Sequence, residues 1–224
     1  MFELFGITFY WYGFLIGIGI WVAMEIALAR RGEIAKRVFE KAMAWAVVSG
    51  VIGARIYHVV DYWGRYYSLN WSRVFYFWDG GLGIWGALVG GVLGVMIFSY
   101  FNKLKILKLF DSLIVGVPLA QAVGRVGNYI NRELYGKNGE PLFAYEAVLN
   151  LVLFGLIWKW SQKKRIPGLI FGVYLIGYGV IRAVLENFRP EESIWKFSGV
   201  PVAVIFSFCA VSVGAYFVFR KRPT

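Results

Sequence analysis

Long apolar runs alternate with short polar segments along the chain. Seven runs are long enough to cross a bilayer as a helix, which requires about 20 predominantly apolar residues. They cover residues 10–29, 42–60, 82–101, 111–127, 143–160, 168–186 and 199–219. The pattern predicts an all-α integral membrane protein with seven transmembrane helices. Because the intervening loops are too short for a separate globular domain, residues 1–224 are expected to form a single polytopic membrane domain.

The segments between the runs alternate in their content of lysine and arginine. Those after the first, third, fifth and seventh runs carry fifteen basic residues, whereas the opposite set carries six. Basic residues are enriched in the cytoplasmic loops of membrane proteins. The asymmetry therefore predicts an N-terminus outside the membrane and a C-terminus in the cytoplasm.

Composition agrees with this assignment, since 59% of the 224 residues are hydrophobic and 19% are aromatic. Soluble domains contain about 45–50% apolar residues. The net charge of +11 could indicate nucleic-acid binding, but the basic residues fall in short clusters between apolar runs, so no nucleic-acid partner is expected. With one cysteine, Cys209, and one histidine, His58, the chain offers no disulfide framework and no Cys- or His-rich metal site. We therefore expect neither a metal nor a cofactor, and we interpret Cys209 as an inert packing residue.

Three arginines lie inside the apolar runs, all toward the ends predicted to be outside. They are Arg55, Arg125 and Arg182, in the second, fourth and sixth runs. A charged residue at membrane depth is costly and usually lines a polar cavity, so three guanidinium groups indicate an anionic ligand there. Alternatively, each side chain could extend to the lipid headgroups without a functional role.

The second run ends near a segment dense in Trp, Tyr and Phe, residues 61–81. Such residues prefer the headgroup level, so an outer interfacial segment is predicted there. Arg55 and His58 precede it and share a helix face because they are three residues apart. His58 is a possible base near neutral pH, but we favour the interpretation that it is a histidine hydrogen-bonded at the interface.

Small residues recur at four-residue spacing in two of the runs. Gly86, Gly90 and Gly94 do so in the third run, and Gly13 and Gly17 repeat the pattern in the first. A stripe of this kind allows two helices to approach closely. We predict a packing role for these glycines rather than a catalytic one.

The sixth run ends in a group of polar residues. Arg182 and Glu186 stand at i and i+4 and can form an ion pair, with Tyr178 four residues before Arg182 on the same face. Arg189 follows about one turn later. An intrahelical ion pair explains Arg182 and Glu186 without a function, but it does not explain their neighbours.

The fourth run ends in the sequence GRVGNYINRELYG, residues 124–136. This order resembles the signature of the phosphatidylglycerol–prolipoprotein diacylglyceryl transferases. Further motifs of the same family are matched across most of the chain. They are W-Y-G at residues 11–13, G-x-R at Gly53 and Arg55, Y-E at Tyr145 and Glu146, and Y-G-x-x-R-x-x-x-E-x-x-R at residues 178–189.

The resemblance implies a multi-pass enzyme of the bacterial cytoplasmic (inner) membrane, with its active site toward the outer leaflet. Such enzymes transfer the diacylglyceryl group of phosphatidylglycerol to the lipobox cysteine of a prolipoprotein signal peptide. A thioether forms and glycerol phosphate leaves. The implied catalytic residues are Arg125, Arg182, Glu133 and Tyr12. The implied phosphatidylglycerol-binding residues are Arg125, Asn128, Tyr178, Gly136 and Arg55.

One departure from the family concerns the start of the third run. Many relatives carry a histidine, often proposed as catalytic, where GGLGIWGAL has Trp85. Three acceptors for the thiol proton remain: His58, Glu133, or bulk water acting on a thiol that arginine has already made more acidic. We favour the third, with Glu133 orienting Arg125.

An alternative function is a transporter or flippase for an anionic solute or lipid, with the arginines as its binding site. Broken helices, inverted repeats and polar residues near the midplane would favour a transporter. Here the charges cluster toward one face and no repeat is visible, which favours the enzyme.

Overall fold

The computed structural model describes residues 2–4, 7–9, 11–76, 80–163 and 166–220. Within these ranges, seven helical segments are long and apolar enough to cross a membrane, which confirms the predicted number. In chain order the helices are α1 (Trp11–Ala29), α2 (Lys36–Asp61), α3 (Ile84–Phe101), α4 (Ile106–Leu113), α5 (Val117–Ile130), α6 (Leu142–Trp160), α7 (Leu169–Glu186) and α8 (Val202–Phe219).

The remaining elements are short. Two antiparallel strand pairs, which the hydrophobic pattern did not predict, are β1 (Phe2–Leu4) with β2 (Ile7–Phe9) and β3 (Lys196–Phe197) with β4 (Val200–Pro201). The single-turn helices are η1 (Trp63–Tyr67), η2 (Trp71–Phe75), η4 (Ile114–Gly116) and η5 (Glu191–Ser193).

The fourth span is composite and longer than predicted, since it runs from Ile106 to Ile130 through α4, η4 and α5. The tighter turn η4 lies where α1 comes closest. A Cβ atom on Gly116 would stand 2.6 Å from the Cα atom of Ala23, so only glycine allows this approach. Pro118 follows in the first turn of α5, where a missing N–H is tolerated.

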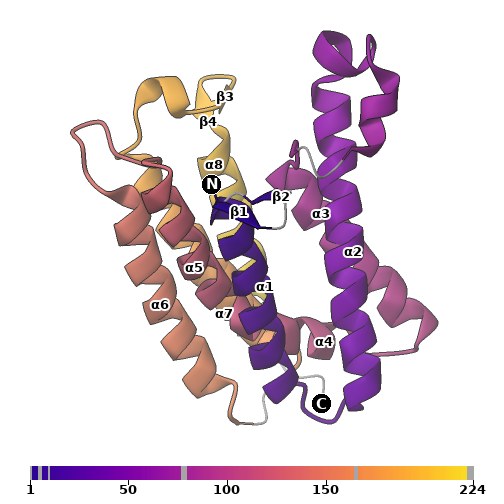
Figure 1. The fold of residues 1–224 in the computed structure, drawn as a ribbon. Helices are drawn as coiled ribbons and strands as arrows, with labels where there is room; N and C mark the ends of the chain where they lie inside the picture. Colours follow the sequence, from indigo (N-terminus) through magenta and orange to yellow (C-terminus); the bar gives the residue numbers. More distant parts are fainter. Residues whose placement is uncertain (1, 5–6, 10, 77–79, 164–165, 221–224) are drawn as a thin grey trace. The chain divides into compact units, whose positions relative to one another are not determined.

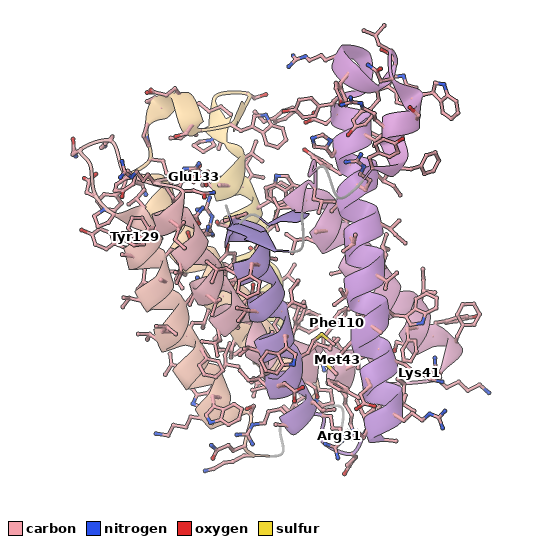
Figure 2. The ribbon with its side chains drawn as sticks, in the orientation of Figure 1. Arg31, Lys41, Met43, Phe110, Tyr129 and Glu133 are labelled. Atoms are coloured by element: carbon pink, nitrogen blue, oxygen red, sulfur yellow. The ribbon has the colours of Figure 1, made fainter. Side chains whose placement is uncertain are left out.

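The chain divides into two compact units, residues 1–32 with 110–224, and residues 33–109. In the first unit α1 packs on α5, α5 on α6, α6 on α7, and α7 on α8 (Figure 1). Its buried core consists of Val115, Leu142, Leu153, Ile157, Ile170, Tyr174, Ile181 and Leu185. Figure 2 shows Glu133 at one end of this unit and Arg31 at the opposite end.

The second unit is a hairpin of α2 and α3, with η1 and η2 between them. A Cβ atom on Gly53 would lie 2.9 Å from the Cα atom of Gly90, so the two backbones touch. Gly86 and Gly94 face α2 equally closely, which confirms the packing role predicted for this stripe.

Two minor predictions are wrong. Gly13 and Gly17 have nothing within 4 Å of a Cβ position, and α1 instead approaches α5 through Gly19, whose Cβ atom would lie 3.2 Å from the Ala120 carbonyl oxygen. A four-residue spacing identifies a smooth helix face but not whether another helix covers it. Cys209 is exposed on α8 rather than packed.

Candidate active site

Charged residues of α5, α6 and α7 meet at the end of the first unit that carries Glu133. Arg125 Nη2 donates a hydrogen bond to Glu146 Oε1 at 2.7 Å, and its Nη1 donates to Asn128 Oδ1 at 2.8 Å. These two bonds use both ends of the guanidinium fork and fix its plane. Arg125 was predicted as a catalytic and lipid-binding residue of the signature, and its contact with Glu146 joins the signature to α6.

Glu146 also faces α7. Its Oε2 atom lies 4.0 Å from Arg182 Nη1, and its Oε1 atom lies 3.5 Å from the Tyr178 hydroxyl. Arg182 Nη2 donates to Glu186 Oε2 at 3.0 Å, so the predicted i, i+4 pair is present. Arg189 Nη1 stands 3.6 Å from the same Glu186 oxygen. Two carboxylates therefore hold three arginines in one continuous network.

The carboxylates of this network are more deeply buried than its guanidinium groups. The side chains of Glu146 and Glu186 are 1% and 4% exposed, whereas those of Arg125, Arg182 and Arg189 are 23%, 19% and 25% exposed. The carboxylates thus lie behind the arginines, and the accessible side of the network is cationic. Among the directly paired groups, three guanidinium groups face two carboxylates, and this excess of positive charge favours an anionic ligand.

Sequence reasoning matched Glu146 to the family pattern but did not place it among the site residues. The sequence did contain an indication that Glu146 belongs to a site, because it is an acidic residue inside the apolar run 143–160. An ionisable residue in a membrane span usually faces the bundle interior and has a partner. The partners themselves could not be inferred, since they belong to two other helices.

Glu133 acts on Arg125 through Asn128 rather than by direct contact. Asn128 Nδ2 donates to Glu133 Oε2 at 3.2 Å, while Asn131 Nδ2 donates to Glu133 Oε1 at 3.3 Å. The Glu133 carboxylate thereby sets the orientation of the Asn128 amide, which turns its oxygen toward Arg125. The predicted orienting role is thus indirect.

The backbone after α5 is strained where it places Glu133. Arg132 and Leu134 have φ values of 56° and 64°, in the left-handed region that non-glycine residues seldom adopt. Their conformations flank Glu133, whose own N–H donates to the Asn128 carbonyl oxygen at 2.8 Å. Such strain costs on the order of 1–3 kcal/mol per residue and concentrates at functional sites.

Gly136 lets the loop of residues 131–141 pack against the chain that follows α7. A Cβ atom at Gly136 would lie 3.0 Å from the Phe188 carbonyl oxygen and would collide with the Glu140 carboxylate. Lys137 N–H donates to that same carbonyl at 2.8 Å. Hydrogen bonds from the Asn138 amide and backbone also hold the pKa of Glu140 below its ordinary value. Gly136 therefore allows the loop to pack against Phe188, the residue before Arg189. The phosphatidylglycerol-binding role expected of Gly136 stays a prediction.

Tyr12 lies beside the signature helix. A Cβ atom on Gly127 would stand 2.5 Å from Tyr12 Cδ2 and 3.1 Å from Cε2, so the ring covers a glycine surface on α5. Tyr12 and Tyr178 both contribute to the electrostatic surroundings of Arg125. The structure therefore brings together, in one unit, the predicted residues Tyr12, Arg125, Asn128, Glu133, Gly136, Tyr178 and Arg182.

Arg55 and His58 belong to the other unit. The Arg55 guanidinium donates to the carbonyl oxygens of Arg73, Val74, Gly80 and Gly81, at 2.5, 2.9, 2.7 and 3.2 Å. These bonds hold the interfacial segment onto α2. His58 Nδ1 lies 3.1 Å from the Tyr67 hydroxyl, which fits the interfacial hydrogen bond considered above. Phosphatidylglycerol binding by Arg55 and base catalysis by His58 stay predictions.

A second polar layer lies one helical turn deeper in the same three helices. Gln121, Asn150 and Tyr174 are four residues from Arg125, Glu146 and Tyr178, respectively. Asn150 is fully buried, and neither of its side-chain polar atoms has a hydrogen-bond partner within the described ranges. A buried unpaired amide costs about 1–3 kcal/mol.

Replacing Asn150 by leucine should therefore raise the thermal midpoint of unfolding of the detergent-solubilised protein. The substitution keeps the branching of the side chain at Cγ and removes two unsatisfied groups. Thermal unfolding of the two proteins should be followed by circular dichroism in the same detergent. A lower midpoint would show that the amide has a stabilising partner.

The sequence matches the prolipoprotein diacylglyceryl transferase family over residues 1–220. The chain belongs to this family. It is 35% identical to the phosphatidylglycerol–prolipoprotein diacylglyceryl transferase of Clostridioides difficile, an alignment covering 85% of this chain and 83% of the relative. The corresponding protein of Corynebacterium diphtheriae is 34% identical over 94% of this chain and 88% of its own length. That of Streptococcus equi subsp. zooepidemicus is 30% identical over 99% and 94%. The resemblance predicted from residues 124–136 is thus confirmed.

Proposed function

We propose that Arg125 and Arg182, held by Glu146, bind the phosphate of phosphatidylglycerol and stabilise its departure as glycerol phosphate. Family membership makes the chain a phosphatidylglycerol–prolipoprotein diacylglyceryl transferase, an enzyme of lipoprotein modification. The observation that carries the proposal is the geometry around Glu146, where one buried carboxylate pairs with arginines from two helices and leaves their outer faces accessible.

The chemistry follows from charge. The thiolate of the lipobox cysteine attacks the glyceryl carbon that carries the phosphate ester, so a C–S bond forms as the C–O bond breaks. The electron pair of the broken bond moves onto the phosphate oxygen, where negative charge develops. Guanidinium groups already in place stabilise that charge without reorganisation. The same positive field lowers the pKa of the incoming thiol and favours its thiolate.

The other site residues would orient the lipid. Asn128 and Tyr12 would hold ester and phosphate oxygens, with Glu133 fixing the Asn128 amide. Tyr178, within reach of Glu146, would keep that carboxylate from contacting the substrate phosphate. Arg189 extends the cationic face by one further guanidinium group, through Glu186.

A direct experiment combines purified protein in detergent with phosphatidylglycerol and a synthetic lipobox peptide. Mass spectrometry should detect the thioether on the peptide, together with free glycerol phosphate. The break in the fourth span at η4 is a feature that transporters also use. Solute uptake into liposomes without thioether formation would therefore support the transporter hypothesis instead.

Orientation in the membrane is part of the proposal, with the cluster toward the outer leaflet and the N-terminus outside. In a Cys209→Ala background, cysteine at position 138 should react with an impermeant thiol reagent added to whole cells after removal of the cell wall. Cysteine at position 162 should react only after the membrane is opened. These positions lie in loops at opposite ends of the same unit, so reversed labelling would invert the orientation.

We expect His58→Gln to retain activity within about tenfold, because loss of a general base typically costs 10²–10⁴-fold. The pH–rate profile should still rise with thiolate formation, and its midpoint should move when the pKa of the peptide thiol is changed. A hundredfold loss with unchanged folding would instead identify His58 as the base.

A further inference from the structure

Five buried side-chain polar atoms have no hydrogen-bond partner within the described ranges, and four of them lie in or next to the Arg125–Glu146 network. One is Nε of Arg125 itself, and the others are Oε1 of Gln121 and both Nδ2 and Oδ1 of Asn150. Asn150 is the most deeply buried of the three residues, with 0% of its surface exposed. Buried polar groups are almost always paired in native proteins, so their concentration beside a site indicates a use for the unpaired amide.

Asn150 stands one helical turn after Glu146 on α6, and residues four apart share a helix face. The Cα–Cβ bonds of a helix tilt toward its N-terminus, so the Asn150 side chain leans toward Glu146 rather than away from it. Its Nδ2 group is a donor, and the Glu146 carboxylate is an acceptor. α5 repeats the arrangement, since the unpaired donor Arg125 Nε follows the unpaired acceptor Gln121 Oε1 by four residues. The second polar layer therefore holds an unused partner one turn deeper than each member of the pair.

The contacts of Glu146 show where a further donor becomes necessary. Arg125 Nη2 holds Oε1 at 2.7 Å, but Arg182 Nη1 lies 4.0 Å from Oε2, which is beyond hydrogen-bond length. A phosphate at the accessible side of the two arginines shares their donors, so it reduces the positive charge that faces Glu146. The carboxylate is 1% exposed and cannot replace the lost interaction by water. Its ionised form then requires another buried donor.

We propose, on the basis of the function proposed above, that Asn150 is a positioning residue for diacylglyceryl transfer. Its amide donates to Glu146 when the phosphate of phosphatidylglycerol engages Arg125 and Arg182. A bond formed only in the occupied site favours lipid binding, because a ligand shifts an equilibrium by its differential interaction with the two states. The bond also keeps Glu146 ionised, so both arginines stay in place as charge develops on the phosphate oxygen. A loss of stability in exchange for function is common at such sites.

Asn150→Leu should change stability and lipid affinity in opposite directions. Without lipid, its thermal midpoint should exceed that of the wild type because the unpaired amide is gone. Dihexanoyl phosphatidylglycerol, added without peptide so that no transfer occurs, should raise the wild-type midpoint saturably. The same titration should give Asn150→Leu an affinity about 10- to 100-fold weaker, the usual effect of losing a hydrogen bond to a charged group. A merely structural role for Asn150 would lower the midpoint together with the affinity, or leave the affinity unchanged.

Two further variants make the test specific. Asn150→Gln keeps the amide donor and should bind the lipid more tightly than Asn150→Leu. Because glutamine is longer than asparagine, equal weakening in both variants would show a packing effect and overturn the positioning role. Gln162→Leu is the matched control, since it also replaces an amide by leucine, but in the exposed loop after α6, and it should leave the affinity unchanged.

Arg125→Ala separates the role of Asn150 from the proposed phosphate site. We expect weaker lipid binding in both Arg125→Ala and Asn150→Leu. If only Arg125→Ala loses affinity, Asn150 has no positioning role and the phosphate site stands. If Arg125→Ala binds phosphatidylglycerol as tightly as the wild type, the phosphate site itself is wrong, and the role of Asn150 is overturned with it.

Discussion

Replacing Arg125 by lysine is expected to reduce diacylglyceryl transfer nearly as much as replacing it by alanine. Arg125 contacts Glu146 and Asn128 through two different nitrogens, and its side chain stays 23% exposed. A lysine ammonium group is a compact point charge. It cannot donate to two separated acceptors in one plane, as the planar guanidinium group does. We expect a loss of about 10²–10³-fold in kcat for both variants, as when one preorganised donor is removed from an oxyanion site.

Arg31→Lys is the matched control, since it makes the same chemical change at the opposite end of the same unit (Figure 2). It should retain full activity. Initial rates with phosphatidylglycerol and a lipobox peptide distinguish the variants, and circular dichroism checks that each remains folded. If Arg125→Lys kept most of the activity, Arg125 would act only as a diffuse positive charge.

Glu146→Gln is expected to impair both activity and stability. The carboxylate is 1% exposed and holds Arg125 at 2.7 Å and Arg182 at 4.0 Å. Its neutralisation leaves two guanidinium groups without a shared counter-charge, and breaking a buried pair in this way costs about 3–5 kcal/mol. Because both arginines then lose their fixed positions, transfer should fall by at least as much as in Arg125→Ala.

Two measurements make this prediction specific. Glu192→Gln removes an exposed carboxylate beyond the end of α7 and should change neither the thermal midpoint nor the rate. In a double-mutant cycle, Glu146→Gln combined with Arg125→Ala should cost less than the sum of the two single effects, since the residues act as a unit. Strict additivity would show that Glu146 is not the anchor of Arg125.

Local features of the sequence determined the spans and the family. Apolar length alone identified seven membrane helices, because each span must satisfy its own backbone hydrogen bonds and bury a continuous apolar surface. Spacing along one helix likewise predicted the pair of Arg182 and Glu186, whose side chains meet at i and i+4. The order of residues in 124–136 was specific enough to identify the enzyme family.

Contacts between helices were decided only by the tertiary structure. Glu146 is 21 residues from Arg125 and 36 from Arg182, so no local period relates them, yet packing of α5, α6 and α7 brings all three together. Arg55 resembled the other two arginines in the sequence, but its guanidinium group holds backbone carbonyls of the interfacial segment. A charge in a membrane span needs a partner, and the sequence by itself indicates that need, whereas the fold selects which side chain or carbonyl meets it.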